Sequence, residues 1–268
     1  MLKLKLNLKD TLTCGQMFRY KEADDGYIIY AEDKTAICTQ KGKIAEIKTN
    51  DEEYFYNYFD GDTDYAKIHK ALSFDKTVGA LATEYKGLRL LNQNFWEMLI
   101  SFILSQNNNI TRIQGITEKL CENFGEKKDG FYAFPTPEKL SGCKVEDFSV
   151  LRAGYRDKYI IDASNRYVNN EIDLSLIQNG TTEEAIKELC KIKGVGLKVA
   201  NCILLFGTGR KNAFPVDTWI IKAMKSVYGL ADKTEKEMCK FGEERFGDYA
   251  GYAQQYLFYG IRNGLIKE

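Results

Sequence analysis

Apolar and polar positions alternate along much of the N-terminal third of the chain, a pattern typical of half-buried β-strands. Turn residues such as Asp24-Asp25-Gly26 separate the alternating segments. The pattern predicts strands and turns up to about residue 88, within an N-terminal antiparallel β-sheet domain over residues 1–90. The segments expected to form strands are 2–8, 27–30, 35–39 and 43–48.

From about residue 92 the apolar positions recur at intervals of three and four, which indicates amphipathic helices. Phe95–Ile103 is the most apolar of these segments, and Thr136-Pro137 places a proline in the first turn of another. The sequence therefore predicts an α+β protein whose residues 91–268 form a helical bundle. The expected helices lie near 95–103, 110–121, 136–140, 155–168, 181–191, 197–207, 217–228, 234–246 and 250–263.

Composition excludes several classes of protein. No apolar run approaches the roughly 18 residues of a membrane span, and the alternating N-terminus is unlike a signal peptide. The seven cysteines are odd in number, scattered and without a Cys-x-x-Cys pair, which argues against disulfides or a zinc site and favours a reducing cytosol. Because His69 is the only histidine, catalysis by a histidine triad or a His-rich metal centre is excluded.

The net charge is zero, but the charges are segregated along the chain. Residues 51–64 contain six acidic residues and no basic one, whereas 187–225 is rich in lysine and arginine. A balanced protein can still present a basic face to phosphates, although charge runs are more often solvated surfaces. The basic residues of this stretch are Lys187, Lys191, Lys193, Lys198, Arg210, Lys211, Lys222 and Lys225.

A hairpin between two predicted helices is the most informative local feature. Thr181 and Glu184 form a capping box that starts the first helix, and Gly194-Val195-Gly196 joins it to the second. Glycines allow a tight turn, and the free N–H groups at the next helix start can hold a phosphate. Gly-x-Gly alone is more typical of an ordinary helical turn with a glycine C-cap.

Lys198 and Asp217 favour a functional hairpin over an ordinary glycine-capped turn. Lys198 lies in the first turn of the second helix among other basic residues, surroundings that disfavour a charged ammonium and suit a nucleophilic amine. Asp217 follows 19 residues later and is placed to N-cap the next helix. Taken alone, each is more simply a surface lysine and a capping aspartate. Together, after a Gly-Val-Gly hairpin, they suggest a catalytic pair.

The segment Gly194–Cys202, followed by Pro215-Val216-Asp217, resembles the helix-hairpin-helix/Gly-Pro-Asp DNA glycosylase superfamily, and most closely its 8-oxoguanine DNA glycosylases. The likeness spans nearly the whole chain. The iron–sulfur branch carries four clustered cysteines beyond the aspartate, whereas only Cys239 follows Asp217, so no such cluster is expected. Other segments similar to the 8-oxoguanine branch are Cys14–Tyr20, Gln106–Arg112, Gly154–Arg156 and Ala253–Phe258, the last within a C-terminal helix that would return to the base pocket.

The resemblance implies a pocket for a flipped base. 8-Oxoguanine carries a hydrogen on N7, where guanine has a lone pair, and the carbonyl of Gly15 would accept that hydrogen. Phe258 and Cys202 would face the two sides of the base, and Gln254 would bond its pairing edge. Phe206 would stand at the pocket edge, where relatives often have methionine.

The same resemblance assigns DNA contacts around this pocket. Asn107 would fill the space of the flipped nucleotide and Tyr155 would wedge into the stack, while Arg112 and Arg156 would hold the orphaned cytosine. Besides Phe206, two further departures from the family pattern are Gln106 before the asparagine run and Trp219 where relatives often have a phosphate-contacting histidine. Backbone contacts to DNA are expected at Gly194, Val195, Gly196 and Trp219.

The implied reaction starts with attack of Lys198 on C1′, stabilised by Asp217, and ends with β-elimination from a Schiff base. No metal or organic cofactor is required, although the hairpin carbonyls can hold a structural monovalent cation. The expected partner is double-stranded DNA containing 8-oxoguanine, bound by a monomer without membrane association. The expected location is the cytoplasm, with the nucleoid of a bacterium or archaeon, or the nucleus of a eukaryote.

Three alternatives stay open at this point. A related glycosylase could act on oxidised pyrimidines or alkylated bases, although the Gly15 and Gln254/Phe258 segments argue against it. A non-catalytic module could use the hairpin only to hold DNA backbone. A Schiff-base lyase for small carbonyl compounds would need the repeated strand–helix pattern of an α/β barrel, which the sequence does not show.

Overall fold

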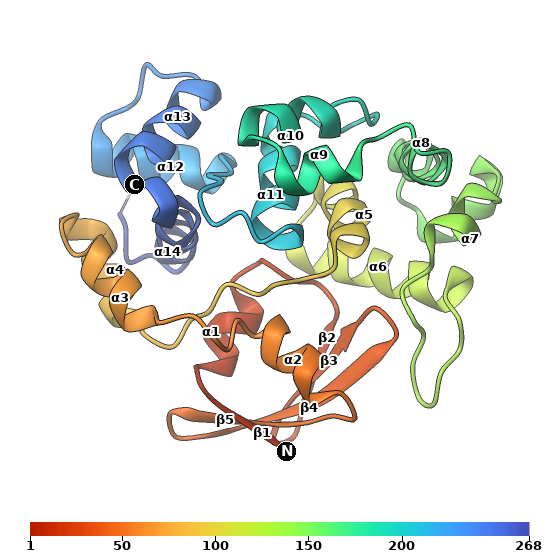
Figure 1. The fold of residues 1–268 in the computed structure, drawn as a ribbon, viewed down its shortest axis with the longest axis horizontal. Coiled ribbons are helices and arrows are strands. Elements are labelled where there is room, and N and C mark those ends of the chain that lie inside the picture. Colours follow the sequence, from red (N-terminus) through yellow and green to blue (C-terminus); the bar gives the residue numbers. More distant parts are fainter. Residues whose placement is uncertain (268) are drawn as a thin grey trace.

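In the computed structural model, which describes residues 1–267, the N-terminal segment forms a five-stranded antiparallel sheet (Figure 1). The strand order is β1-β5-β4-β3-β2. Ile29 pairs with Ala36 and Cys38 with Ile47, so these buried residues share one face, which α1 (Leu8–Thr13) and α2 (Glu52–Tyr58) help to cover. The strands are β1 (Leu2–Lys5), β2 (Tyr20–Ala23), β3 (Gly26–Ala31), β4 (Lys34–Lys41) and β5 (Ile44–Lys48).

The expectation of only strands and turns up to residue 88 is wrong. The first strand ends at Lys5, because Asn7 caps α1. The acidic stretch starts helices instead of lying in loops, since Asp51, Asp64 and Asp75 accept hydrogen bonds from the first backbone N–H groups of three successive helices. These helices are α2, α3 (Tyr65–Leu72) and α4 (Lys76–Glu84).

The helical part confirms the periodic pattern from residue 92 onward, with every expected helix present. Thr181 and Glu184 form the expected capping box, and Pro137 occupies the first turn after the Thr136 cap. The short helix α9 was not expected. The elements are α5 (Phe95–Ser105), α6 (Ile110–Phe124), α7 (Pro137–Ser141), η1 (Val145–Leu151), α8 (Arg156–Val168), α9 (Leu174–Asn179), α10 (Thr182–Leu189), α11 (Leu197–Gly207), α12 (Thr218–Tyr228), α13 (Glu235–Phe246), η2 (Gly247–Tyr249) and α14 (Ala250–Arg262).

Buried apolar side chains form two cores. The smaller core lies under the sheet and includes Leu91, whereas the larger core fills the helical part. Helices α3 and α4 belong to the larger core although they precede residue 90, and α4 packs on α14 (Figure 1). Among the described residues, no helix is long and apolar enough to cross a membrane.

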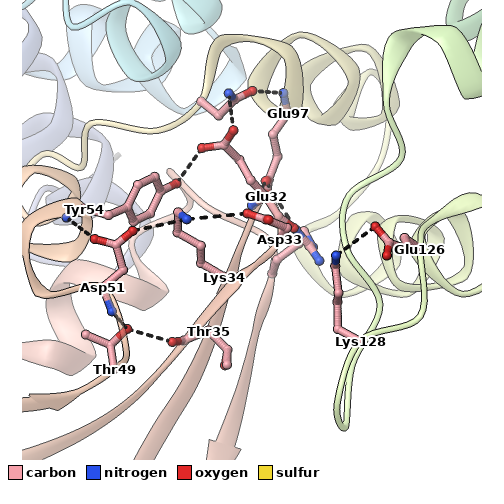
Figure 2. Close-up of polar contacts among 12 residues, drawn as sticks. Glu32, Asp33, Lys34, Thr35, Thr49, Asp51, Tyr54, Glu97, Glu126 and Lys128 are labelled. Carbon is pink, nitrogen blue, oxygen red and sulfur yellow. Dashed lines mark hydrogen bonds and ion pairs between the residues drawn. The ribbon is translucent and has the colours of Figure 1, made fainter.

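Polar contacts join the sheet to α5 and fix the segment that leads into the site. Arg19 donates to the Glu97 carboxylate at 3.3 Å and to the Tyr132 carbonyl at 2.7 Å, and both charged side chains are buried. The backbone N–H of Glu32 donates to Glu97 at 2.9 Å, and Tyr54 donates to the Glu32 carboxylate at 2.9 Å (Figure 2). Removing one partner of such a buried pair typically costs about 3–5 kcal/mol, so these contacts hold the Cys14–Arg19 segment firmly against the helices.

Candidate active site

A pocket of about 350 Å³ lies where the Cys14–Phe18 segment meets α5, α11, α12 and α14. This volume is at the lower end of the range of about 300–1,000 Å³ that small-molecule sites occupy. The structure brings the expected catalytic and base-pocket residues together, although they come from both ends of the chain. Those lining the pocket are Gly15, Lys198, Cys202, Phe206, Asp217, Gln254 and Phe258, with Trp219 beside them.

Lys198 is the second residue of α11 and is half-buried at the mouth of the pocket. Its Nζ lies 5.7 Å from the centre of the Phe102 ring, which stacks on Phe206 at 5.6 Å and 14°. The aromatic pair therefore forms an apolar floor under the amine. Lys198 also lines a second hollow of about 710 Å³ that opens beside the pocket. The amine thus stands between the base pocket and the open surface. Its expected uncharged state stays a prediction.

Asp217 is the N-cap of α12, and it lines both the base pocket and the second hollow beside it. Its Oδ1 accepts a hydrogen bond from the Ile220 backbone N–H at 2.8 Å. Burial raises the pKa of Asp217, while the Ile220 N–H and the positive charge of Lys198 act in the opposite direction. The capping role and the proposed electrostatic role are compatible, because the cap fixes the carboxylate beside the pocket that contains Lys198.

Cys202 lies one turn after Lys198 and is buried in the pocket wall. Burial raises the pKa of the Cys202 thiol to about 11, and the nearby charges of Lys198 and Asp217 act on it in opposite directions. The thiol therefore stays protonated at neutral pH. It can contact a base as a small apolar group but is a poor nucleophile.

The Gly15 backbone is left-handed, with φ +84°. A Cβ at this position would lie 3.1 Å from Phe258 and 3.3 Å from Nη1 of Arg262. Gln255 of α14 donates to the neighbouring Cys14 carbonyl at 2.9 Å. Glycine is therefore favoured here by the left-handed backbone, with little space for a Cβ, and the loop is tied directly to α14.

Gln16 and Arg19, both in the Cys14–Tyr20 segment that resembles the 8-oxoguanine branch, anchor this loop to the rest of the protein. The buried Gln16 side chain donates to the Arg89 carbonyl and accepts from the Leu91 N–H, both at 2.8 Å. Arg19 is held by the buried carboxylate of Glu97. These two residues fix the loop from behind, and Gly15 and Phe18 line the pocket.

Gln254 presents a polar group to the pocket. Its Nε2 donates to the Pro215 carbonyl at 3.1 Å, whereas its buried Oε1 has no hydrogen-bond partner within the described residues. A buried acceptor without a partner costs free energy, and a ligand with an N–H group would remove that cost. The position suits the expected bond to the pairing edge of a base.

The asparagine run lies at the rim of the site. Asn109 caps α6, Asn108 donates to the Leu104 carbonyl, and Asn107 is exposed with a left-handed backbone at φ +49°. Asn107 and Arg112 line the second hollow together with Lys198. The expected contacts of Asn107 and Arg112 with DNA stay predictions.

The predicted wedge and its neighbour have different environments. Tyr155 is 50% exposed at the start of α8, as a wedge requires. Arg156 is buried and donates to the carbonyls of Gln106 and Ala153, both at 2.9 Å. In this structure Arg156 holds the loop before Asn107, so contact with an orphaned base requires at least part of this bonding to be released.

The two hairpin glycines have different roles. Gly194 has φ +82°, and a Cβ there would lie 2.3 Å from the Tyr159 ring, whereas Gly196 has extended backbone and open space around it. The Val195 side chain is buried, which leaves the hairpin backbone at the surface. Gly196 is therefore the position where another molecule can approach the backbone most closely.

The expected basic face is smaller than the sequence suggests. Arg210 donates to the Ile177 and Gly180 carbonyls, and the Lys211 amine donates to Asn92 at 2.9 Å. Burial lowers the pKa of Lys211 to about 8, against the opposite effect of Asp60. The exposed positive charge near the hairpin comes from residues such as Lys193, which is paired with Asp162 at 3.5 Å.

Several pocket residues were not expected from the sequence, among them Phe18, Phe102 and Arg262. Phe18 lies in the Cys14–Tyr20 segment of the resemblance, and Arg262 follows Phe258 by one helical turn. The sequence could therefore have indicated both as pocket residues. Phe102 belongs to an almost wholly apolar helix, where periodicity does not distinguish a pocket from the core. Within residues 1–267, no group of three or more His, Cys, Asp or Glu side chains is placed to hold a metal ion.

Comparison with known proteins agrees with this geometry. Residues 1–99 match the sequence family of the N-terminal domain of 8-oxoguanine DNA glycosylases. Residues 100–247 match the family of HhH-GPD superfamily base excision DNA repair proteins. The chain therefore belongs to the HhH-GPD superfamily of base excision DNA repair proteins, in its 8-oxoguanine DNA glycosylase branch. The family and fold expected from the sequence are confirmed.

Individual relatives support the same placement. The crystal structure of the Clostridium acetobutylicum 8-oxoguanine glycosylase/lyase, in complex with duplex DNA containing cytosine opposite 8-oxoguanine, has a TM-score of 0.93 and 38% identity, covering 98% of this chain and 94% of that one. The N-glycosylase/DNA lyase OGG1 of Arabidopsis thaliana is 32% identical, over 95% of this chain and 77% of its own. A probable N-glycosylase/DNA lyase of Methanothermobacter thermautotrophicus is 32% identical over 72% and 69% of the two chains.

Proposed function

We propose that this protein excises 8-oxoguanine from duplex DNA and then cleaves the DNA strand at the resulting site. The observation that carries the proposal is that Lys198, Asp217 and Gly15 line one pocket. The names of the relatives, N-glycosylase/DNA lyase and 8-oxoguanine glycosylase/lyase, agree with both activities. The absence of a repeated strand–helix pattern in residues 1–267 argues against the barrel lyase.

The reaction starts when the damaged nucleotide leaves the base stack and its base enters the pocket. The Lys198 amine attacks C1′ while the bond between C1′ and the base breaks and its electron pair leaves with the base. Asp217 stabilises the positive charge that develops on the sugar. A proton then passes from nitrogen to the ring oxygen as the C1′–O4′ bond breaks, and the nitrogen electron pair forms the C=N bond of a Schiff base between Lys198 and C1′.

Strand cleavage follows from the same intermediate. Removal of a proton from C2′ allows the C3′–O bond to break, and the 3′ phosphate leaves with the electron pair. Hydrolysis of the remaining Schiff base frees Lys198. One amine therefore serves both activities, and the sequence of steps requires no metal or redox cofactor.

Recognition of the lesion rests on three groups of the pocket. The Gly15 carbonyl accepts the hydrogen on N7, Phe258 stacks on the base with Cys202 opposite, and Gln254 bonds the pairing edge through its free Oε1. Phe206 limits the depth of the pocket. A hydrogen bond of this kind discriminates by about 1–3 kcal/mol, so several contacts must act together.

The surface beside the pocket binds the DNA. The gap that the flipped nucleotide leaves in the base stack is filled by Asn107 and Tyr155. The partner base is held by Arg112 and by Arg156, once Arg156 is released from its carbonyl partners. The backbone of Gly194, Val195 and Gly196, with Trp219, contacts the phosphates. The protein works as a monomer in the compartment that contains the DNA, and the hairpin carbonyls hold a structural monovalent cation when DNA is bound.

Trapping with borohydride tests this function directly. Wild-type protein is incubated with a duplex containing one 8-oxoguanine opposite cytosine, and borohydride reduces any Schiff base to a stable cross-link. Lys198→Gln should bind the duplex and form no cross-link, with strand cleavage reduced at least about 10⁴-fold, since the nucleophile is lost. The matched control is Lys119→Gln, an exposed lysine of α6 outside the pocket, which should cross-link like wild type.

Each outcome has a separate meaning. Cross-linking by Lys198→Gln at the wild-type level would show that another amine is the nucleophile. A wild-type protein that neither cleaves nor cross-links the 8-oxoguanine duplex, but does so with an oxidised pyrimidine or alkylated base, would assign it to another lesion. DNA binding without any cleavage would favour the non-catalytic module.

A further inference from the structure

Arg262 places an unused hydrogen-bond donor at the base pocket. Its Nη2 donates to the Thr13 carbonyl, and its guanidinium lies 5.5 Å from the Phe258 ring centre. Its Nη1 is buried and has no hydrogen-bond partner within residues 1–267. Arg262 also lines the pocket itself. A buried cationic donor without an acceptor is costly, so an acceptor supplied by a bound molecule would be favourable there.

The position of Nη1 relative to Gly15 narrows the choice of acceptor. The Arg262 Nη1 lies 3.3 Å from the position that a Cβ at residue 15 would occupy. The side chains of Phe258 and Ile110 lie 3.1 and 3.4 Å from the same position. Both of these side chains are half-buried, and a base reaches the buried Nη1 when one of them moves aside. The donor therefore stands next to the loop whose carbonyl is proposed to accept the hydrogen on N7.

Helix geometry separates the two ends of the base. Gln254, Phe258 and Arg262 are spaced four residues apart on α14, which places them along one face. At 1.5 Å per residue, Gln254 and Arg262 lie about 12 Å apart along the axis, with Phe258 between them. A purine stacked on Phe258 with its pairing edge toward Gln254 turns its imidazole end toward Arg262. The oxygen that oxidation adds at C8 lies at that end.

We propose that Arg262 is a specificity-determining residue whose Nη1 donates a hydrogen bond to O8 of the flipped 8-oxopurine. This inference rests on the proposed function, because it assigns a further contact in the same base pocket. Guanine has a C–H group at C8, which leaves Nη1 without an acceptor. The lesion is then recognised at two adjacent atoms, N7–H by the Gly15 carbonyl and O8 by Arg262.

The test compares base excision with cleavage of an abasic site. Arg262→Met should lower single-turnover excision of 8-oxoguanine opposite cytosine by about 10- to 100-fold, the loss expected for a hydrogen bond from a charged group. Cleavage of a duplex with a preformed abasic site, which contains no base, should change less than about threefold. Arg262→Lys, which keeps the charge and one donor, should recover part of the excision rate.

Arg210→Met provides a matched structural control. Arg210 also donates to backbone carbonyls and also has a buried unpartnered nitrogen, Nε, but it lies outside the pocket. Its replacement should leave the ratio of excision to abasic-site cleavage unchanged. Thermal unfolding of all variants separates losses of folded protein from losses of recognition.

A second substrate identifies the acceptor atom. 8-Oxoadenine keeps O8 and replaces O6 with an amino group. In the Lys198→Gln background, where no base is removed, Arg262→Met should weaken binding of duplexes with either lesion by the same factor. A loss restricted to 8-oxoguanine would place Nη1 on O6 and overturn the assignment to O8.

Two further results would also overturn the inference. One is wild-type excision by Arg262→Met, and the other is an equal loss of abasic-site cleavage, which would indicate a general structural role. Failure of the proposed function itself is distinguishable, because it would appear as inactivity of wild-type protein on 8-oxoguanine, whereas the inference depends on ratios between variant and wild type.

Discussion

The two walls of the pocket are built in different ways. The wall with Lys198 and Asp217 comes from the starts of α11 and α12, and each residue is placed by local structure, a hairpin and a helix cap. The opposite wall joins Gly15 to α14, from the two ends of the chain. Long-range hydrogen bonds, such as Gln255 to the Cys14 carbonyl at 2.9 Å, hold that wall together.

This difference separates chemistry from recognition. In the proposed reaction Lys198 and Asp217 act on the sugar, so changes there should affect every substrate, including an abasic site. In the proposed reaction Gly15 and the α14 residues contact only the base, so changes there should affect excision and leave abasic-site cleavage nearly intact. The two activities therefore report on the two walls separately.

After loss of the lysine itself, Asp217→Asn should have the largest effect on activity. Asparagine is as good an N-cap as aspartate, so the fold is kept, but the negative charge beside the developing sugar cation is lost. Excision and abasic-site cleavage should both fall by about 10²- to 10³-fold in single-turnover assays. A loss confined to excision would contradict the division between the walls.

The pH dependence of Asp217→Asn sharpens this prediction. Burial raises the pKa of Asp217, so wild-type activity should decline with falling pH earlier than an ordinary aspartate would cause. Because the folded-state pKa is raised, protonated Asp217 stabilises the fold at acidic pH, and this stability is lost as pH rises through the folded value. Asp217→Asn should therefore unfold at a higher temperature than wild type at neutral pH, with a smaller difference at acidic pH.

Gly15→Ala tests the recognition wall. The new Cβ would lie 3.1 Å from Phe258 and strain a backbone with φ +84°. Excision of 8-oxoguanine should fall by about 10- to 100-fold, with abasic-site cleavage changed less than about threefold. The matched control is Gly42→Ala in the β4–β5 turn, which has φ +59° and open space around it. If both variants lose excision equally, backbone strain and not the pocket is responsible.

The hairpin glycines provide the smallest and most local test. Gly194→Ala places a Cβ 2.3 Å from the Tyr159 ring at a position with φ +82°, and should destabilise the protein by about 1–3 kcal/mol. Gly196→Ala meets open space but replaces the glycine N-cap of α11 with a poorer one, and should destabilise the protein by less than about 1 kcal/mol. In the proposed mode of DNA binding its Cβ stands where a phosphate approaches, so DNA affinity should fall several-fold.

Denaturant unfolding and DNA-binding titrations measure the two effects. Equal destabilisation by Gly194→Ala and Gly196→Ala would contradict the different roles of the two glycines. Unchanged DNA affinity in Gly196→Ala would remove this position from the DNA interface. Both variants should retain the ratio of excision to abasic-site cleavage, since a shift of the hairpin acts on Lys198, which is proposed to serve both activities.

Local patterns predicted much of the fold. Every expected helix after residue 92 is present, because caps such as Thr136 and Thr181 and three- to four-residue periodicity are signals contained in short segments. The helices over residues 52–84 were not predicted, although Asp51, Asp64 and Asp75 mark their starts. An acidic run is usually a solvated surface, whereas these carboxylates cap helices.

The sequence by itself determined the hairpin, the helix starts at Lys198 and Asp217, and the membership of a DNA repair superfamily, because each depends on residues close together in the chain. Only the tertiary structure decided that Arg156 and Lys211 are turned inward and that Arg262 stands beside Gly15. Such placements follow from the packing of segments up to about 250 residues apart, and that packing selects among side-chain positions that local propensity leaves equivalent.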